Sequence, residues 1–445
     1  MAGSRGEFSS RLGFILTAAG SAIGLGNVWG FPGQTAANGG AAFVLVYLIL
    51  SFVIAYPALM AEFTIGRYSR SNIVGAFTKI EGGKKFSIVG YLGLFCGVLI
   101  LSFYSIVGGW MISYVFEVIF KLFGMQEAAT WAISKAPSAN VVFTVIFSLL
   151  TIGIVLGGVK NGIEKWATRL MPVLIGMLVL LIIYVMTLDG ASKGLSVYLV
   201  PDFSKIFDKQ LIISALGQSF FSMSLGVGSM LVYGSYIRKQ ENLASTGALV
   251  TLADLIIAFL AGLLIIPAMY VAEANGVQIY DAAGKLIADS NIAFQVLPPL
   301  FETLGAFGTT VAFIFFLLMT IAAVTSSISL LEIPVAHMVD DKNMERKKAS
   351  WISGIAILCV SLLIISNFGA LFGLVITIAT QYLEPIVGLS LCIFIGWVMN
   401  RNSILNELKE GYPEVENSLF YKIWPIFVRF VCPALIIIIF INTTF

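Results

Sequence analysis

Hydrophobic stretches long enough to cross a membrane follow one another along the whole chain, separated by short polar loops. A transmembrane helix needs about 20 apolar residues, and eleven stretches come close to that length. They cover residues 11–36, 40–66, 88–120, 140–158, 167–188, 210–237, 245–272, 297–337, 350–367, 371–399 and 420–443. The pattern predicts an all-α membrane protein that forms a single transmembrane domain over residues 1–445, embedded in a lipid bilayer.

The first and the sixth stretch are interrupted in ways that a continuous helix should avoid. Residues 20–27 read GSAIGLGN, and residues 217–228 read GQSFFSMSLGVG, so both are rich in glycine and polar groups. Broken helices are tolerated in lipid only where the freed backbone is buried or lines a polar cavity. Either break alone could reflect close glycine-mediated helix packing. Two breaks at matching positions favour a transporter site near the membrane midplane.

The order of the stretches indicates an internal repeat. Spans one and six begin two sets of five, repeat one over about 11–188 and repeat two over about 210–399, followed by helix 11 over about 420–443. Because five is odd, the second set enters the membrane from the opposite side. The predicted inner loops hold 19 Lys and Arg residues and the outer loops 6. Positive charge stays inside, so we expect a cytoplasmic N-terminus and an extracytoplasmic C-terminus.

Composition narrows the possible functions. The chain is 58% hydrophobic and 11% charged, which excludes an ordinary soluble domain, and its net charge of +2 argues against nucleic-acid binding. The four cysteines lie in apolar stretches and are expected to be core residues. His337 is the only histidine, so zinc, haem and iron–sulfur sites are not expected. The N-terminus shows no small-residue cleavage site, which predicts no removable signal peptide.

Several polar residues inside the apolar stretches could carry chemistry. Asp254 lies within span seven, where a carboxylate is costly unless it faces a partner or a bound cation. Asn27, Ser222 and Ser224 add oxygen atoms at the two breaks, and the exposed ends of half-helices suit a carboxylate or a cation. The simpler interpretation of Asp254 is a carboxylate that is hydrogen-bonded to neighbouring helices. Glu62 and Glu332 are expected to tie broken helices together.

Three further features have a plain and a functional interpretation. Residues 325–327 place three hydroxyls in span eight, although such hydroxyls usually bond to their own helix. Tyr104 is a phenol inside span three that could be a packing aromatic. Gly162 and Pro172 lie near the start of span five, where both weaken a helix, so this end could unwind locally.

Together these motifs resemble the neurotransmitter:sodium symporter family, in particular its bacterial amino-acid transporter branch with eleven transmembrane helices. The resemblance rests on GSAIGLGNVWGFP (20–32), NGG (38–40), EFTIGRYSR (62–70), GQSFFSMSLGVG (217–228), TSSISLLE (325–332) and the Gly162–Pro172 spacing. It implies a five-plus-five inverted-repeat transporter bundle with broken helices 1 and 6 and one extra C-terminal helix. The implied activity is sodium-coupled uptake by alternating access in the plasma (cell inner) membrane, not an enzymatic reaction.

The resemblance also implies ligand sets, which we carry over by motif. Two Na+ ions are expected. Sodium 1 would be held by Ala22, Asn27, Ser222 and Asp254, with the substrate carboxylate, and sodium 2 by Gly20, Ile23, Ala322, Thr325 and Ser326. The residues expected around a small amino-acid substrate are Ala22, Gly24, Leu25, Gly26, Ile100, Tyr104, Phe221, Ser222, Ser224, Val227, Ser326 and Leu330. The residues that match an intracellular gate are Arg5, Phe8, Tyr236 and Asp340.

Departures from the family pattern concern the outer gate and chloride. Gly30 stands where the family usually has Arg, and residues 367–373 contain no acid to pair with one. Asp254 replaces the usual Asn, and Ala258 replaces an expected hydroxyl near an anion pocket. The residues that match this pocket are Tyr47, Gln218 and Ser222. We therefore expect the fixed carboxylate to do the work of chloride, so that transport is chloride-independent.

The substrate class follows from Gly24 and from the side-chain positions. Family members that carry biogenic amines have Asp at the position of Gly24, so a glycine there implies a substrate that brings its own carboxylate. Ile100, Phe221, Val227 and Leu330 are apolar. Hydrophobic L-amino acids, aromatic ones included, are therefore expected. The alternatives are an ion channel that uses the same broken helices or a non-transporting amino-acid sensor; an intramembrane enzyme is disfavoured because no catalytic motif is present.

Overall fold

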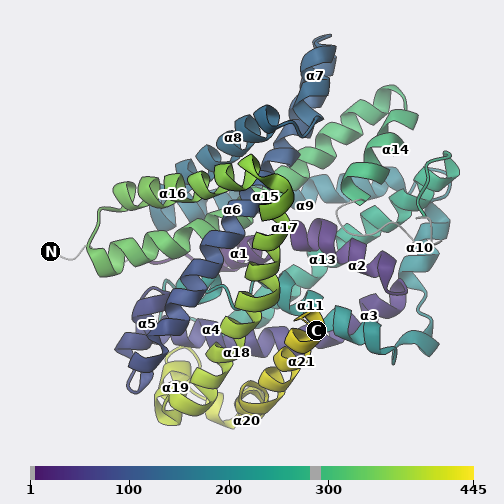
Figure 1. Cartoon of the computed structure of the whole chain (residues 1–445). Coiled ribbons are helices and arrows are strands. Elements are labelled where there is room, and N and C mark those ends of the chain that lie inside the picture. The colour runs from purple at the N-terminus through teal and green to yellow at the C-terminus, as the bar shows by residue number, and fades with distance from the viewer. Residues whose placement is uncertain (1–5, 281–291, 445) are drawn as a thin grey trace.

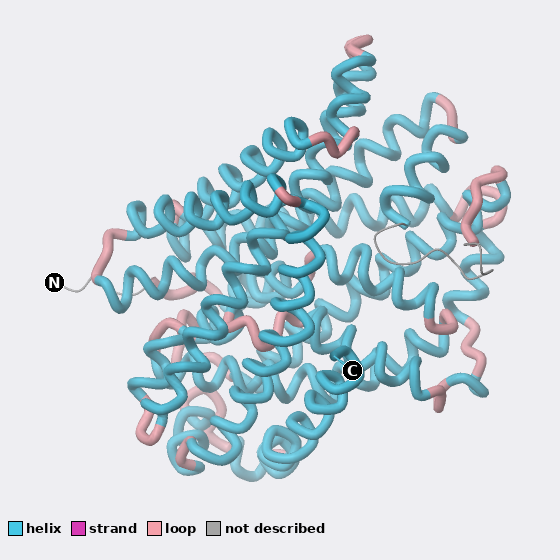
Figure 2. The backbone as a smooth tube through the Cα atoms, viewed as in Figure 1, coloured by secondary structure: helices cyan, strands magenta, loops and turns pink. Residues whose placement is uncertain are grey.

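Helices joined by short loops make up the computed structural model, which describes residues 6–280 and 292–444 (Figures 1 and 2). Within those residues, nine helical segments are long and apolar enough to span a membrane, and a bent pair, 11–22 with 26–37, makes up to ten. The nine are Ala41–Ser69, Gly83–Leu122, Pro137–Val155, Val159–Val185, Leu243–Ala274, Phe307–Lys342, Arg346–Ser366, Phe368–Val398 and Leu419–Thr443. The predicted all-α membrane class is confirmed.

Five spans combine α-helices with short π-helical turns; π and 3-10 turns are labelled η. The composite spans contain α1 (Arg11–Ala22), η1 (Gly26–Gly30) and α2 (Phe31–Ala37); α3 (Ala41–Leu50), η2 (Ser51–Ala55) and α4 (Tyr56–Ser69); η4 (Val159–Glu164) and α9 (Lys165–Val185); α17 (Phe368–Ile376), η7 (Thr377–Leu383), α18 (Glu384–Ile393) and η8 (Phe394–Val398); α20 (Leu419–Ile426), η10 (Phe427–Val431) and α21 (Cys432–Thr444). The unbroken spans are α6 (Ser87–Leu122), α8 (Pro137–Val155), α13 (Leu243–Ala274), α15 (Ala306–Lys342) and α16 (Arg346–Ser366). The connecting elements are α5 (Ile73–Lys79), η3 (Gly83–Phe86), α7 (Gln126–Ile133), α10 (Ala191–Leu199), η5 (Phe203–Lys205), η6 (Ile292–Val296), α14 (Leu297–Thr303), α19 (Arg401–Lys409) and η9 (Val415–Asn417).

Both predicted breaks are present. α1 ends at Ala22, and the helix that restarts at Gly26 is bent by 56° relative to it. The sixth span consists of α11 (Lys209–Ser222) and α12 (Ser229–Gly234), with residues 223–228 between them. These two helices have 14 and 6 residues, so neither alone reaches across a bilayer. The second break is narrower than predicted, because the helix continues to Ser222.

Two predicted span boundaries are wrong. The stretch 297–337 contains both α14 and α15, which a turn separates at Gly305, where φ is +61°. Span eight therefore begins at Ala306. The prediction missed this turn because it depends on a backbone conformation that glycine adopts readily, and hydropathy carries no information about backbone angles. Span five begins eight residues earlier than predicted, at Val159, with the π-helical turn η4.

The core of the bundle is the long pair α6 and α15, which pack along one another in the middle of Figure 1. α1 contacts α15, α13 and α9, and α12 contacts α4 and α15, so both broken spans lie against this centre. Large apolar side chains such as Leu180, Ile183 and Leu363 point outward and are more than half exposed. An apolar outer surface is the arrangement that a bilayer requires.

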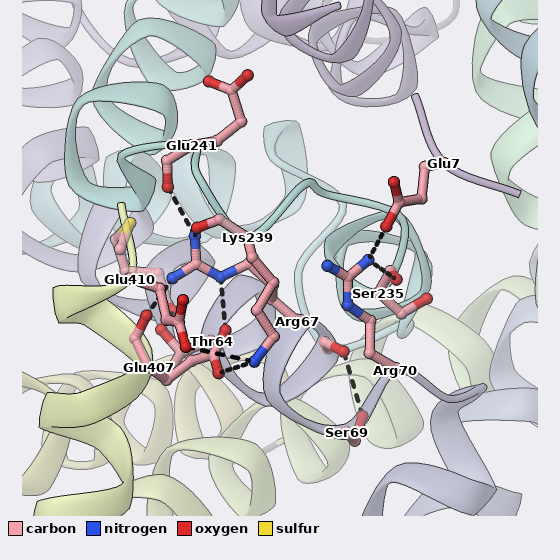
Figure 3. A network of polar contacts seen from close by, with 12 residues as sticks. Glu7, Thr64, Arg67, Ser69, Arg70, Ser235, Lys239, Glu241, Glu407 and Glu410 are labelled. Atoms are coloured by element: carbon pink, nitrogen blue, oxygen red, sulfur yellow. Dashed lines mark hydrogen bonds and ion pairs between the residues drawn. The ribbon is translucent and has the colours of Figure 1, made fainter. Parts of the chain in front are cut away.

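The two ends of the bundle differ in character. We call the end with α5 and α19 the N-terminal face, and the end with α7, α10 and α14 the distal face (Figure 1). On the N-terminal face, Arg67 is fully buried, and its Nε donates to Glu407 Oε1 at 2.7 Å (Figure 3). Its Nη1 donates to the carbonyl of Glu241 at 2.6 Å, and Lys239 Nζ lies 3.3 Å from Glu407. Charged groups thus join α4, the loop after α12 and α19.

Candidate functional site

A cavity of about 500 Å³ lies where the two breaks meet α6 and α15. Its described wall reaches the distal face, where Lys135 lies in the loop after α7 and Phe294 lies in η6, just before α14. All twelve residues that the sequence indicated for substrate line its wall. They are Ala22, Gly24, Leu25, Gly26, Ile100, Tyr104, Phe221, Ser222, Ser224, Val227, Ser326 and Leu330.

Gly24 forms the tightest part of the first break. A Cβ atom at this position would lie 2.4 Å from Ser326 Oγ and 2.7 Å from the Tyr104 hydroxyl, so no side chain fits. The backbone N–H of Leu25 donates to the Tyr104 hydroxyl at 3.2 Å. The first break therefore presents bare backbone and a phenol to the cavity.

Beside the cavity, polar side chains from three other helical elements converge on Asp254, which is 1% exposed. Asn27 Nδ2 donates to Asp254 Oδ1 at 2.6 Å, and Ser222 Oγ donates to Oδ2 at 2.8 Å. The Tyr47 hydroxyl donates to Ser222 Oγ at 3.2 Å. Hard cations are held by several oxygen atoms of this kind, and Ala22 contributes to the adjoining cavity wall. A buried carboxylate with hydroxyl and amide neighbours fits a sodium ion.

A second group of oxygen atoms lies between α1 and α15. Thr325 Oγ1 donates to the Ala322 carbonyl at 3.0 Å, and Ser326 Oγ donates to the carbonyls of Ser21 at 3.1 Å and Gly20 at 3.5 Å. Ile23 caps the end of α1, where φ and ψ leave the helical region. These contacts bring the residues predicted for sodium 2 to one place. Ser21 was missed by the sequence analysis, because only the fold shows which carbonyl faces Ser326.

The second break is built around left-handed backbone. Ser224, Gly226 and Gly228 have φ values of +51°, +76° and +90°. Glu62 supports this segment, because its carboxylate accepts from the N–H of Gly226 at 2.8 Å and of Leu231 at 3.1 Å. The prediction that Glu62 ties a broken helix together is confirmed by these contacts.

Comparison with known proteins identifies the architecture. The sequence model of the sodium:neurotransmitter symporter family matches residues 5–139 and 134–445. The chain belongs to this family. It is 34% identical to the uncharacterized sodium-dependent transporter YhdH of Bacillus subtilis, over 98% of this chain and 97% of that protein. It is 26% identical to the human sodium- and chloride-dependent GABA transporter 2, over 95% of this chain and 76% of that protein.

The solved structures include one with the same fold. The crystal structure of MhsT in complex with L-phenylalanine superposes with a TM-score of 0.84 at 35% identity, covering 99% of this chain and all of MhsT. The protein is therefore a multi-pass membrane transporter that couples a small-molecule substrate to sodium. The family consists of symporters, so this chain is not an enzyme.

The predicted intracellular gate is partly visible in the transporter. The N–H of Phe8 donates to the Tyr236 carbonyl at 3.3 Å, and the two rings meet edge to face with centroids 6.3 Å apart. Asp340 accepts from the N–H of Asn72 at 2.9 Å. Arg5 lies outside the described residues. Phe8 therefore packs against the loop after α12. The Arg5–Asp340 pair stays a prediction.

The predicted unwinding of span five is not seen in this state of the transporter. Gly162 lies in the π-helical turn η4, which follows Gly158 with φ +79°, and Pro172 lies inside the continuous helix α9. The irregular turn marks this end as locally weak. Unwinding between Gly162 and Pro172 stays a prediction.

The mouth of the cavity contains residues that the sequence analysis did not single out. Its wall includes Trp29, Trp110, Lys135, Phe294, Gln295, Phe368 and Phe372, and Glu384 lies in the cavity wall beside the second break. Lys135 belongs to the loop between α7 and α8, and burial lowers its pKa from the ordinary value of 10.5. One feature of the sequence could have drawn attention to Lys135: no acidic residue lies within seven positions on either side of it.

Proposed function

We propose that this transporter carries hydrophobic L-amino acids, aromatic ones included, together with sodium by alternating access. The observation that carries the proposal is the lack of space at Gly24, where a Cβ would clash with Ser326 and Tyr104. Without an acidic side chain at position 24, the part of the cavity wall that the first break forms offers an amine no carboxylate, since Asp254 is buried against Asn27 and Ser222. A substrate that brings its own carboxylate supplies that charge, and the backbone at the break suits a carboxylate.

The side-chain end of the cavity supports a hydrophobic substrate. Ile100, Val227 and Leu330 are buried apolar residues in its wall, and Phe221 exposes its ring to the cavity. Apolar walls with a few placed polar groups are typical of small-molecule sites. The similar transporter MhsT was solved in complex with L-phenylalanine, which supports an aromatic amino acid as a substrate here.

We further propose two sodium sites, at Asp254 with Asn27 and Ser222 and at Thr325 with Ser326. Chloride independence rests on the first of them. Asp254 supplies a fixed negative charge beside Tyr47 and Ser222, and Ala258 offers no hydroxyl to an anion. One relative, the human GABA transporter 2, is by name both sodium- and chloride-dependent. The two proteins should therefore respond differently to chloride removal.

The orientation and the internal repeat complete the proposal. The N-terminal face is cytoplasmic, because it carries most of the basic loop residues, and the distal face opens to the outside of the cell inner membrane. Repeat one covers about 11–188 and repeat two about 210–399, related by an inverted arrangement. The outer gate closes without the usual Arg–acid pair, since position 30 is a glycine.

The decisive experiment is uptake of L-phenylalanine into proteoliposomes along an inward sodium gradient. Saturable accumulation above equilibrium, abolished when sodium is replaced by N-methyl-D-glucamine, supports symport and contradicts a channel or a sensor. Competition by each of the twenty amino acids should rank aromatic and aliphatic ones first. A preference for glutamate or lysine would contradict the substrate class. Replacing external chloride by gluconate should leave uptake unchanged.

A further inference from the structure

Lys135 is held in an unusual conformation at the mouth of the cavity. It lies between α7 and α8 with φ +54°, in the left-handed region that side chains other than glycine seldom adopt. Its carbonyl accepts from Asn140 Nδ2 at 3.0 Å, and Asn140 Oδ1 accepts from Trp110 Nε1 at 2.8 Å. The loop is thus anchored to α6 through Trp110, which fixes the position from which the lysine side chain starts.

The ammonium group of Lys135 lies over two aromatic rings of the cavity wall. Its Nζ is 4.7 Å from the ring centroid of Trp110 and 4.9 Å from that of Phe294. Both distances allow cation–π attraction. In the part of the chain that the structure describes, no carboxylate lies within 4.0 Å of this nitrogen. By contrast, Lys193 on the same face pairs with Glu273 at 2.7 Å.

Lys135 is also the one basic side chain among the described residues of the cavity wall. A Cβ at Gly30 would meet nothing closer than 3.8 Å, so that position leaves open space rather than a charge. The other groups near the mouth are mostly aromatic, including Trp29, Phe368 and Phe372. Among the described residues of the wall the one acid is Glu384, which is 2% exposed and lies against the second break. An entering molecule therefore meets one accessible cation surrounded by apolar rings.

We infer that Lys135 is a substrate-capturing residue, whose ammonium group attracts the carboxylate of an incoming amino acid while the flanking rings receive its apolar side chain. The inference rests on the proposed function. Charge at the mouth of a low-dielectric cleft concentrates ligands of opposite charge and speeds their entry. Such attraction acts on the encounter, so it lowers KM without contributing to the translocation step. It is also screened by salt.

The test is the initial rate of L-phenylalanine uptake by wild type, Lys135→Met and Lys135→Arg at constant sodium. Ionic strength is varied with N-methyl-D-glucamine chloride. For Lys135→Met we expect KM to rise about three- to tenfold at low ionic strength, with the maximal rate and the sodium dependence unchanged. The difference should shrink as salt is added. Lys135→Arg should stay within about twofold of wild type, because the charge and the ring contacts are kept.

Two controls separate capture from structural damage. Lys193→Met removes a cation from the same face that also lies over a ring, that of Tyr270, but already has an acid partner; its KM should not change. Inhibition of uptake by L-phenylalaninamide, which lacks the carboxylate, should be equal in wild type and Lys135→Met. Unfolding temperatures in detergent should agree among all variants.

The outcomes distinguish the inference from the proposed function. If wild-type protein shows no sodium-dependent uptake of any amino acid, both are overturned. If wild type transports and Lys135→Met has an unchanged KM, or if Lys135→Arg loses as much as Lys135→Met, only the role of Lys135 is overturned. A KM increase that persists undiminished at high salt would also overturn it.

Discussion

The two broken spans interrupt a membrane helix in different ways. The first break comprises only residues 23–25 and contains no left-handed residue. The chain bends there by 56° and continues as a π-helical turn. The second takes residues 223–228 and contains three left-handed residues. The first break is thus short and free of left-handed residues, whereas the second is longer and takes its shape from left-handed residues.

Their supports differ accordingly. The first break is contacted by cavity-lining hydroxyls, those of Tyr104 and Ser326. The second is held by the carboxylate of Glu62 and pressed by α18, because a Cβ at Gly226 would lie 2.2 Å from the Glu384 carbonyl. We therefore expect the first break to form binding surface and the second to depend on a buried scaffold. Substitutions near the first break should mainly change substrate binding. Substitutions near the second break should also reduce the stability of the fold.

The largest effect is expected for Gly24→Ala. The added methyl group would lie 2.4 Å from Ser326 Oγ, so the first break must shift and the site loses its geometry. Displacements of about 1 Å can cost about 100-fold in rate, and we expect L-phenylalanine uptake to fall by at least about that factor. Gly217→Ala is the matched control, because its Cβ would meet no atom within 4 Å. Uptake near the wild-type rate in Gly24→Ala would contradict this description of the first break.

Asp254→Asn should have the next largest effect. Removing the charge keeps the shape but loses a charge-assisted contact worth about 1.5–3 kcal/mol, so the sodium concentration for half-maximal uptake should rise at least about tenfold. Chloride should then stimulate the variant, whereas we expect it to leave wild type unaffected. The measurement is uptake against sodium, in chloride and in gluconate. An unaltered sodium requirement would exclude Asp254 as a sodium ligand.

Glu62→Gln should weaken the second break. The carboxylate accepts from two backbone N–H groups of the break and of α12, and a neutral amide accepts more weakly. We expect the unfolding temperature in detergent to fall by at least about 3 °C and uptake to fall by about tenfold. Glu127→Gln, an exposed position in α7, is the control. An unchanged unfolding temperature would show that the second break does not need this support.

Ser326→Ala should have the smallest effect. It removes the hydroxyl that donates to the Ser21 carbonyl at 3.1 Å and, at the longer distance of 3.5 Å, to the Gly20 carbonyl. A hydrogen bond of this kind is worth about 0.5–1.5 kcal/mol. Substrate affinity in a competition binding assay should fall by about threefold, with no change in the unfolding temperature. A loss of stability would instead place Ser326 in the scaffold and reduce the contrast between the two breaks.

Much of the fold could be predicted because apolar length and glycine content are local properties. They located both breaks, and embedded acids such as Asp254 and Glu62 stood out against their apolar surroundings. The turn at Gly305 was missed, since hydropathy does not register φ. Ser21 and Lys135 were missed because their importance depends on what approaches them in space: a serine of α15 in one case and two aromatic rings in the other.

At the proposed sodium site, we also expect Asp254 to make the carrier sensitive to membrane voltage. A fixed carboxylate stays with the protein after ions and substrate leave, so Asp254 would then add an uncompensated negative charge within the bilayer. A full charge crossing a potential of 100 mV gains about 2.3 kcal/mol, and an interior-negative potential therefore speeds the return of the empty site to the outside. Charge movement in the absence of substrate should be measurable in wild type and lost in Asp254→Asn. One buried acid, 1% exposed, would thus determine the direction in which the membrane potential drives the empty carrier.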